Sequence, residues 1–232
     1  MDFSRDELAR LRGAVARYGE AEARGGIFSF YKPKGPTSHA FLNQIRKLTD
    51  TRRIGHAGTL DPLASGVLVV GIGAESTKRL SDIVEKEKEY IAKIKFGYES
   101  STDDEEGEKK EINPLLKPSR AEIEETFLKF IGNIKQVPPA FSAAKVRGER
   151  AHRRARRGEK FNVGAHSVEI KEIKIIDYNF PFLTLSVTTG PGVYIRSLAR
   201  DLGRELKTGA YLAELERIRV GDFTADRSIR LS

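Results

Sequence analysis

The stretch Gly55-His56-Ala57-Gly58-Thr59-Leu60-Asp61-Pro62-Leu63-Ala64-Ser65-Gly66 leads directly into the apolar segment 67–72, Val-Leu-Val-Val-Gly-Ile. That segment is short, rich in β-branched residues and flanked by glycines, which predicts a buried strand. The loop before it carries one carboxylate, Asp61, and one imidazole, His56. A carboxylate at the mouth of a buried strand is a candidate nucleophile or general base. The alternative is an ordinary Asp-Pro turn beside a packed or solvated histidine.

The composition favours a folded protein with a polyanionic partner. The chain has 232 residues, of which 39% are hydrophobic, and a formal charge of +8. Such a length fits one large domain, and the basic excess makes nucleic acid the first partner to consider. Cysteine is absent and the four histidines lack ligand spacing, so we expect no disulfides, metal or other cofactor. The sequence shows neither a leader pattern nor an apolar run of membrane-spanning length, which predicts a cytoplasmic protein without membrane contact.

Several further elements follow from periodicity and capping signals. Amphipathic spacing predicts a helix within residues 1–24, and residues 77–84 are also expected to be helical. A capping box at Ser119 predicts a helix that ends near Ile131. The strands and the last predicted helix are 27–31, 88–96, 167–178, 182–188 and about 195–206. In 88–96 the alternation places Tyr90 on the buried face, and the acidic run 100–107 is expected to be a solvated loop.

The most basic part of the chain lies between Lys145 and Lys160. Its eight cations face only two acidic residues, Glu149 and Glu159. This excess is larger than a solvated helix face needs, so we interpret the segment as an RNA phosphate-binding region. The expected contacts are Lys145, Arg147, Arg150, Arg153, Arg154, Arg156 and Arg157. Lys32, in the stiff turn 32–38, could either contact phosphate or lie in a solvated turn.

The loop around Asp61 resembles the signature of the TruB family of tRNA pseudouridine synthases, which act on uridine 55. The resemblance extends from about Gly26 to about Phe223 and includes the turn 32–38, Gln136–Lys145, Val193–Arg196 and the closing segment Gly209–Arg219. Four positions differ from the usual family pattern: Tyr31 for aspartate, Phe141 for tyrosine, Val193 for threonine, and Glu216 for a basic residue. The segment 1–24 lies outside the resemblance.

The resemblance implies an α+β pseudouridine-synthase fold, with a large, mixed but mostly antiparallel sheet and flanking helices. It implies a catalytic domain over residues 26–232 with a basic RNA-gripping insertion at about 136–165, preceded by a helical arm, 1–25. Many family members continue into a C-terminal PUA-type RNA-binding domain. We expect this chain to be a short form without it.

The resemblance also implies roles for individual residues. Asp61 would be the essential catalyst, acting on the base, on the sugar or on a sugar proton. Arg196 would pair with Asp61 and orient it. An arginine in the first turn of a helix opposes the helix dipole, which independently suggests an anionic partner. The flipped uridine would be held by Tyr90, Tyr194 and Leu215, while His56 would stack beside it or fill the space that it leaves.

The substrate implied is the T-arm of tRNA, with the chain acting as a monomer and without an obligate protein partner. Three alternatives remain at this point. The first is the catalytic subunit of a guide-RNA-dependent pseudouridine synthase, whose core motifs are similar. The second is a non-catalytic tRNA-binding or chaperone protein. The third is a generic basic protein, which does not explain five separated motifs in the right order.

Overall fold

The computed structural model describes residues 26–112, 117–142, 144–146, 148–159 and 161–231. The chain forms two compact units. The first combines the chain up to Lys88 with the segment Glu216–Ser232, and the second is Glu89–Leu215. The helix predicted within residues 1–24 lies outside the described residues. No helix in the described part of the chain combines the length and the apolarity that crossing a membrane would take.

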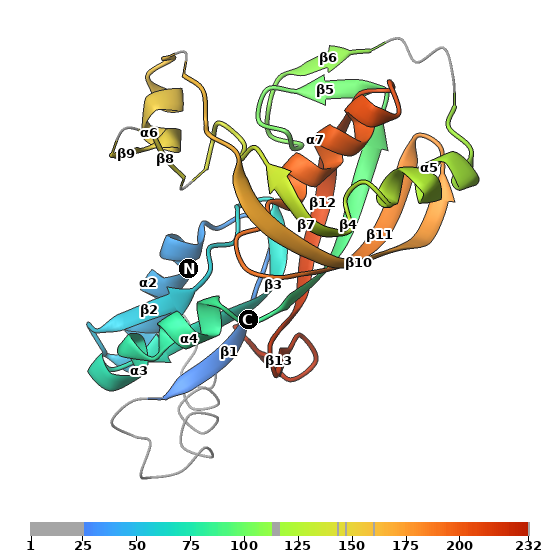
Figure 1. Cartoon of the computed structure of the whole chain (residues 1–232). Helices are drawn as coiled ribbons and strands as arrows, with labels where there is room; N and C mark the ends of the chain where they lie inside the picture. The colour runs from blue at the N-terminus through green and yellow to red at the C-terminus, as the bar shows by residue number, and fades with distance from the viewer. Residues whose placement is uncertain (1–25, 113–116, 143, 147, 160, 232) are drawn as a thin grey trace. The chain divides into compact units, whose positions relative to one another are not determined.

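The described residues of the first unit form sheet strands and three helices (Figure 1). Its elements are β1 (Ile27–Lys32), α2 (Ser38–Thr49), β2 (Ile54–Ala57), β3 (Ala64–Ile72), α3 (Ala74–Lys78), α4 (Leu80–Val84), β13 (Phe223–Thr224) and β14 (Ile229–Arg230). Strand β3 pairs antiparallel with both β1 and β2, and β14 pairs parallel with β1. The predicted buried strand is confirmed, because Val67, Leu68, Val69 and Val70 are fully buried in β3.

The second unit is built on long antiparallel strands (Figure 1). Its elements are β5 (Tyr98–Ser100), β6 (Lys109–Glu111), α5 (Arg120–Phe127), β7 (Gly132–Gln136), β8 (Lys145–Val146), β9 (Glu149–Arg150), α6 (Ala151–Arg156), β10 (His166–Asn179), β11 (Phe182–Thr189) and α7 (Ile195–Glu205). Strand β10 pairs with β11 along one edge and with β7 along the other. The chain passes between the two units within β4 (Lys88–Phe96) and β12 (Ala210–Val220).

Most predicted helices and strands are confirmed, but some of their boundaries differ from those predicted. Strand β4 has the predicted bounds, with alternate residues buried along its whole length. The capping box at Ser119 is present, but α5 ends at Phe127 and does not reach Ile131. The single helix predicted over 77–84 is wrong, because the chain forms the two short helices α3 and α4 there.

Candidate active site and RNA-binding segment

Asp61 lies in the loop between β2 and β3, where its backbone is held on both sides. The Gly35 N–H donates to the Pro62 carbonyl (2.8 Å), and the Ala64 N–H donates to the carbonyl of Asp61 itself (3.1 Å). The Ser38 hydroxyl bonds to the backbone of Leu60. The turn 32–38 therefore forms hydrogen bonds with the loop on both sides of Asp61, which is partly exposed.

Arg217 of β12 braces the two ends of the same loop. Its buried guanidinium donates from Nε to the Val67 carbonyl (2.8 Å) and from Nη2 to the Gly58 carbonyl (3.1 Å). A charged donor makes a strong hydrogen bond, so this contact fixes the loop ends firmly. Sequence reasoning missed Arg217, because an arginine in a strand rich in charged residues is expected to face solvent.

His56 of β2 lies in the same unit and is partly buried. Its Nδ1 atom is buried and has no hydrogen-bond partner among the described residues. Burial, reinforced by the charge of Arg217, lowers the pKa of His56 below its ordinary value. The neutral imidazole is therefore favoured.

The prediction that the Lys32 side chain is open to solvent is wrong. It is fully buried in β1, and its Nζ donates to the carbonyls of Pro33 (2.8 Å) and Pro36 (2.9 Å). Both alternatives offered for Lys32 required a side chain open to solvent. In this geometry the ammonium instead closes the turn that holds the Asp61 loop.

In the second unit, Arg196 lies buried in the first turn of α7. The anionic partner that its position suggested is present, because Nη1 lies 3.4 Å from Oδ2 of Asp104. The same guanidinium donates to the carbonyls of Thr102 (3.3 Å) and Phe141 (3.0 Å). Three segments of the unit therefore set its position.

The prediction that 100–107 is a solvated loop is wrong for Asp103 and Asp104. Asp104 is buried beside Arg196, and Asp103 Oδ2 accepts a hydrogen bond from Arg200 Nη1 at 2.7 Å. Burial raises the pKa of Asp103, and the charge of Arg200 opposes that rise. Two carboxylates of the acidic run therefore form ion pairs with arginines of α7.

Tyr194, immediately before α7, is held through its backbone. The buried side chain of Gln136 accepts from the Tyr194 N–H (2.8 Å) and donates to the Tyr194 carbonyl (3.1 Å). The ring of His166 meets the Tyr194 ring edge-on, with centroids 6.0 Å apart. Sequence reasoning missed Gln136 as a site residue, although it lies in a quoted motif. Tyr90 is buried in β4 as predicted, and Leu215 is partly buried in β12.

The predicted site residues thus belong to two groups. Asp61 and His56 lie in the first unit, together with Lys32, whereas Tyr90, Tyr194, Arg196 and Leu215 lie in the second. Buried side chains hold the Asp61 loop in the first unit, and Arg196 and the Tyr194 backbone are held by polar contacts in the second. The pairing of Arg196 with Asp61 stays a prediction.

The basic segment forms a small hairpin, β8–β9, followed by α6. Arg157 makes a two-pronged ion pair with Glu149 (2.7 and 2.8 Å), and Arg154 pairs with Glu159 (2.7 Å). The exposed residues Arg150, Arg153 and Arg156 make no ion pair with any described residue. The structure does not describe Arg147 or the side chain of Lys145.

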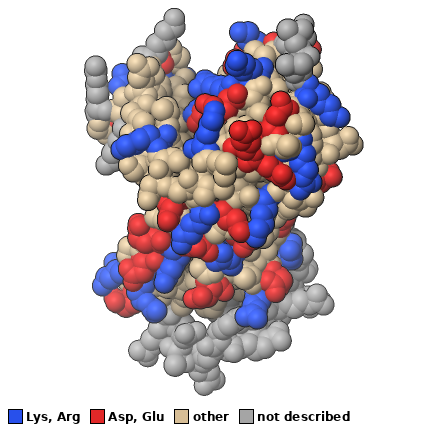
Figure 2. Space-filling model, turned by 45° about the vertical axis from the view of Figure 1, so that its right-hand side comes forward, with Lys and Arg blue, Asp and Glu red and all other residues tan. Residues whose placement is uncertain are grey.

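Figure 2 shows Lys and Arg side chains interspersed with Asp and Glu over the face that it draws. The net charge of +8 is therefore not gathered into one patch on that face. The exposed residues Arg150, Arg153 and Arg156, which form no ion pair with a described residue, stand out against this mixed background.

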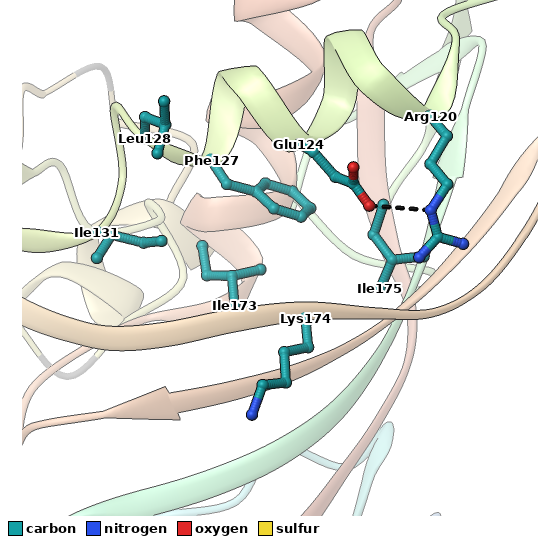
Figure 3. A pocket seen from close by; sticks show the side chains of 8 residues that line it. All are labelled: Arg120, Glu124, Phe127, Leu128, Ile131, Ile173, Lys174 and Ile175. Carbon is teal, nitrogen blue, oxygen red and sulfur yellow. Dashed lines mark hydrogen bonds and ion pairs between the residues drawn. The ribbon is translucent and has the colours of Figure 1, made fainter.

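A surface pocket of about 390 Å³ lies between α5 and β10 (Figure 3). Phe127, Leu128 and Ile173 line it, and an ion pair between Arg120 and Glu124 crosses its rim. It contains none of the predicted site residues, so it is separate from the candidate active site. Among the residues that the structure describes, no group of three or more His, Asp or Glu side chains could hold a metal ion.

Comparison with known proteins identifies sequences and structures that are similar to this chain. The profile described as "TruB family pseudouridylate synthase (N terminal domain)" matches residues 46–195. "tRNA pseudouridine synthase B" of Thermobifida fusca is 43% identical over 89% of this chain and 73% of its own length. The protein of that name from Parabacteroides distasonis is 39% identical over 87% of this chain and 88% of its own length.

A solved structure, "Crystal Structure of a Cbf5-Nop10-Gar1 Complex", matches with a TM-score of 0.71 and 28% identity. The match covers 91% of this chain and 54% of the matched chain, so this chain spans about half of that longer protein. The likeness confirms the predicted α+β pseudouridine-synthase fold with its large mixed sheet. On the profile and the relatives together, the chain belongs to the TruB family of pseudouridylate synthases.

Proposed function

We propose that this protein isomerises the T-loop uridine at position 55 of tRNA to pseudouridine. The observation that carries the proposal is the Asp61 loop, whose family signature is held by hydrogen bonds to its backbone on both sides of the carboxylate. The reaction breaks the C1′–N1 bond, rotates the base and forms a C1′–C5 bond. It needs no net oxidation or reduction and no group donor.

Asp61 is the essential carboxylate of this proposal, and Arg196 keeps it ionised and oriented. An arginine beside a carboxylate favours the charged form. The position of Arg196 within its own unit, where it contacts Asp104 and two carbonyls, supports such a role because the guanidinium is already held in place there. Asp61 would act on the base, on the sugar or on a sugar proton.

The target base has to leave its stack to reach the carboxylate. In the proposal, Tyr90, Tyr194 and Leu215 hold the flipped uridine, and His56 stacks beside it or fills the vacated space. The double hydrogen bond of Gln136 to the Tyr194 backbone supports this, since it fixes the point from which the Tyr194 ring projects. Neutral His56 fits a contact with an uncharged base.

RNA binding is assigned to the basic segment. Arg150, Arg153 and Arg156 are exposed and lack carboxylate partners among the described residues, which leaves their charge available to phosphates. Arg154, Arg157, Lys145 and Arg147 complete the proposed set. A folded T-arm would be recognised through its shape and phosphates more than through its sequence.

We further propose that the chain acts alone and as a monomer. The alternative is a guide-RNA-dependent catalytic subunit, favoured by the likeness to Cbf5, which the matched structure shows in complex with Nop10 and Gar1. The curated relatives named tRNA pseudouridine synthase B are more similar in sequence, at 39–43% identity against 28%. That difference supports the stand-alone function.

The test is to incubate the purified protein with an unmodified tRNA transcript and to map pseudouridine at single-nucleotide resolution. Asp61→Asn runs in parallel, with Asp82→Asn as a matched control at an exposed carboxylate of α4. We expect pseudouridine at the T-loop uridine with the wild type and Asp82→Asn, but not with Asp61→Asn. Tight tRNA binding by all three proteins without any product would instead support the binding-protein or guide-dependent alternatives.

A further inference from the structure

Ser38, the first residue of α2, makes two hydrogen bonds to one residue of the catalytic loop. Its Oγ accepts from the Leu60 N–H at 2.8 Å and donates to the Leu60 carbonyl, also at 2.8 Å. The Ser38 hydroxyl thus satisfies both the N–H and the C=O of Leu60, as a neighbouring strand would do. Leu60 directly precedes Asp61 in the chain.

Burial makes this contact consequential. Ser38 is 2% exposed and Leu60 is 3% exposed, so water cannot readily replace the hydroxyl. Without it, the N–H and C=O of Leu60 would lose these partners inside the protein, which is unfavourable for backbone groups. The loop would then tend to shift so that both groups find new partners, and Asp61 would shift with it.

The other hydrogen bonds that hold the loop do not act on Leu60. Gly35 holds the residue after Asp61, through the Pro62 carbonyl. With Ser38 removed, the loop keeps the Gly35 contact on the C-terminal side of Asp61 and the Arg217 contacts at Gly58 and Val67, but it loses the contact nearest to Asp61 on the N-terminal side. The Leu60–Asp61 peptide, whose orientation helps to set the direction of the carboxylate, would then lose its direct restraint.

We propose that Ser38 is a positioning residue for Asp61 in the isomerisation. This inference rests on the function proposed above. Ser38 does not touch the substrate in this assignment. It holds the Leu60 backbone so that the Asp61 carboxylate is presented to the flipped uridine without reorganisation, because a small misplacement of a catalytic group is costly.

The experiment compares Ser38→Ala with Ser38→Thr, which retains a hydroxyl, and with Thr37→Ala as the matched control. Thr37 caps the same helix by accepting from the Ala40 N–H (3.0 Å) and is exposed. Its loss weakens α2 without removing a contact to the loop. Single-turnover rates at saturating tRNA, dissociation constants for tRNA and amide exchange over residues 58–64 are measured for each protein.

We expect Ser38→Ala to slow the single-turnover step by about 10- to 100-fold, with little change in tRNA affinity. The Leu60 amide should exchange at least about tenfold faster, while Thr37→Ala leaves both quantities near wild type. Ser38→Thr should restore part of the rate. Equal effects of Ser38→Ala and Thr37→Ala, or unchanged exchange at Leu60, would overturn the proposal. If the wild type forms no pseudouridine, the proposed function fails, and exchange at Leu60 still decides whether Ser38 holds the loop.

Discussion

Replacing Gly66 by alanine tests the close approach of β3 to β12 beside the candidate site. Gly66 has φ +108°, a conformation that residues with a side chain rarely adopt. A Cβ atom there would lie 2.2 Å from the Arg217 carbonyl oxygen and 2.7 Å from the Arg217 nitrogen. Both contacts are with backbone, so no side chain can swing aside to relieve them.

Two effects set the size of the loss. A residue other than glycine with such a positive φ costs about 1–3 kcal/mol. Forcing the strands apart to relieve the contact with Arg217 costs about another 1–3 kcal/mol, as overpacking does in a well-packed interior. We therefore expect Gly66→Ala to lower the free energy of unfolding by about 4 kcal/mol. That loss corresponds to a fall in melting temperature of about 8–16 °C for a chain of this length.

Gly132→Ala is the matched control, because Gly132 has φ +94° but has no atom within 4 Å of the position of an added Cβ. It should show the cost of the backbone conformation alone. Denaturant unfolding of both variants gives the two free energies, and their difference measures the contact with β12. If Gly66→Ala is no less stable than Gly132→Ala, the reasoning from the close approach is refuted.

Three other changes have defined outcomes. Because the pKa of His56 is lowered in the fold from 6.5, the unfolded chain binds the proton more readily, so stability is lost as the pH falls below 6.5. His56→Gln should flatten that loss in urea unfolding between about pH 5 and 7.5, and an unchanged slope would contradict this. Combined Arg153→Ala and Arg156→Ala should reduce the slope of log affinity for tRNA against log salt by about one for each phosphate that these arginines neutralise, whereas an unaltered slope would exclude their binding to phosphate. Gln136→Ala leaves the Tyr194 N–H and C=O without these partners, so thermal unfolding should report a loss of about 2 kcal/mol, and a loss below about 0.5 kcal/mol would show that the contact is dispensable.

The sequence predicted the elements whose signals are local. Strand β4 follows from strict alternation, and α5 begins where Ser119 and Glu122 complete a capping box. The helix over 77–84 was wrong because its periodicity is shared by two short helices, which meet at Arg79. Nothing in that stretch marks the break, since Arg79 is itself compatible with a helix.

The sequence failed on charged residues that are buried. Lys32, Asp104 and Arg217 were expected to face solvent or were not singled out, yet each is almost fully buried. Burying a charge is costly unless it is paired or well hydrogen-bonded. The partners are carbonyls or side chains that other segments bring close, such as the Gly58 and Val67 carbonyls for Arg217. Such partners are a property of the folded chain and leave no pattern around the buried residue.

The two halves of the proposed function depend on different kinds of contact. The Asp61 loop is held by buried groups, Ser38 and Arg217, whose hydrogen bonds are shielded from ions in solution. The basic segment is arranged by partly exposed pairs such as Arg157 with Glu149, which are individually weak and screened by salt. A firmly held catalytic loop and an adaptable RNA-binding surface suit the proposed enzyme, which would recognise a folded RNA by its shape and then isomerise one nucleotide of it. Preorganisation is most useful in the Asp61 loop, because movement of the catalytic carboxylate would slow the isomerisation.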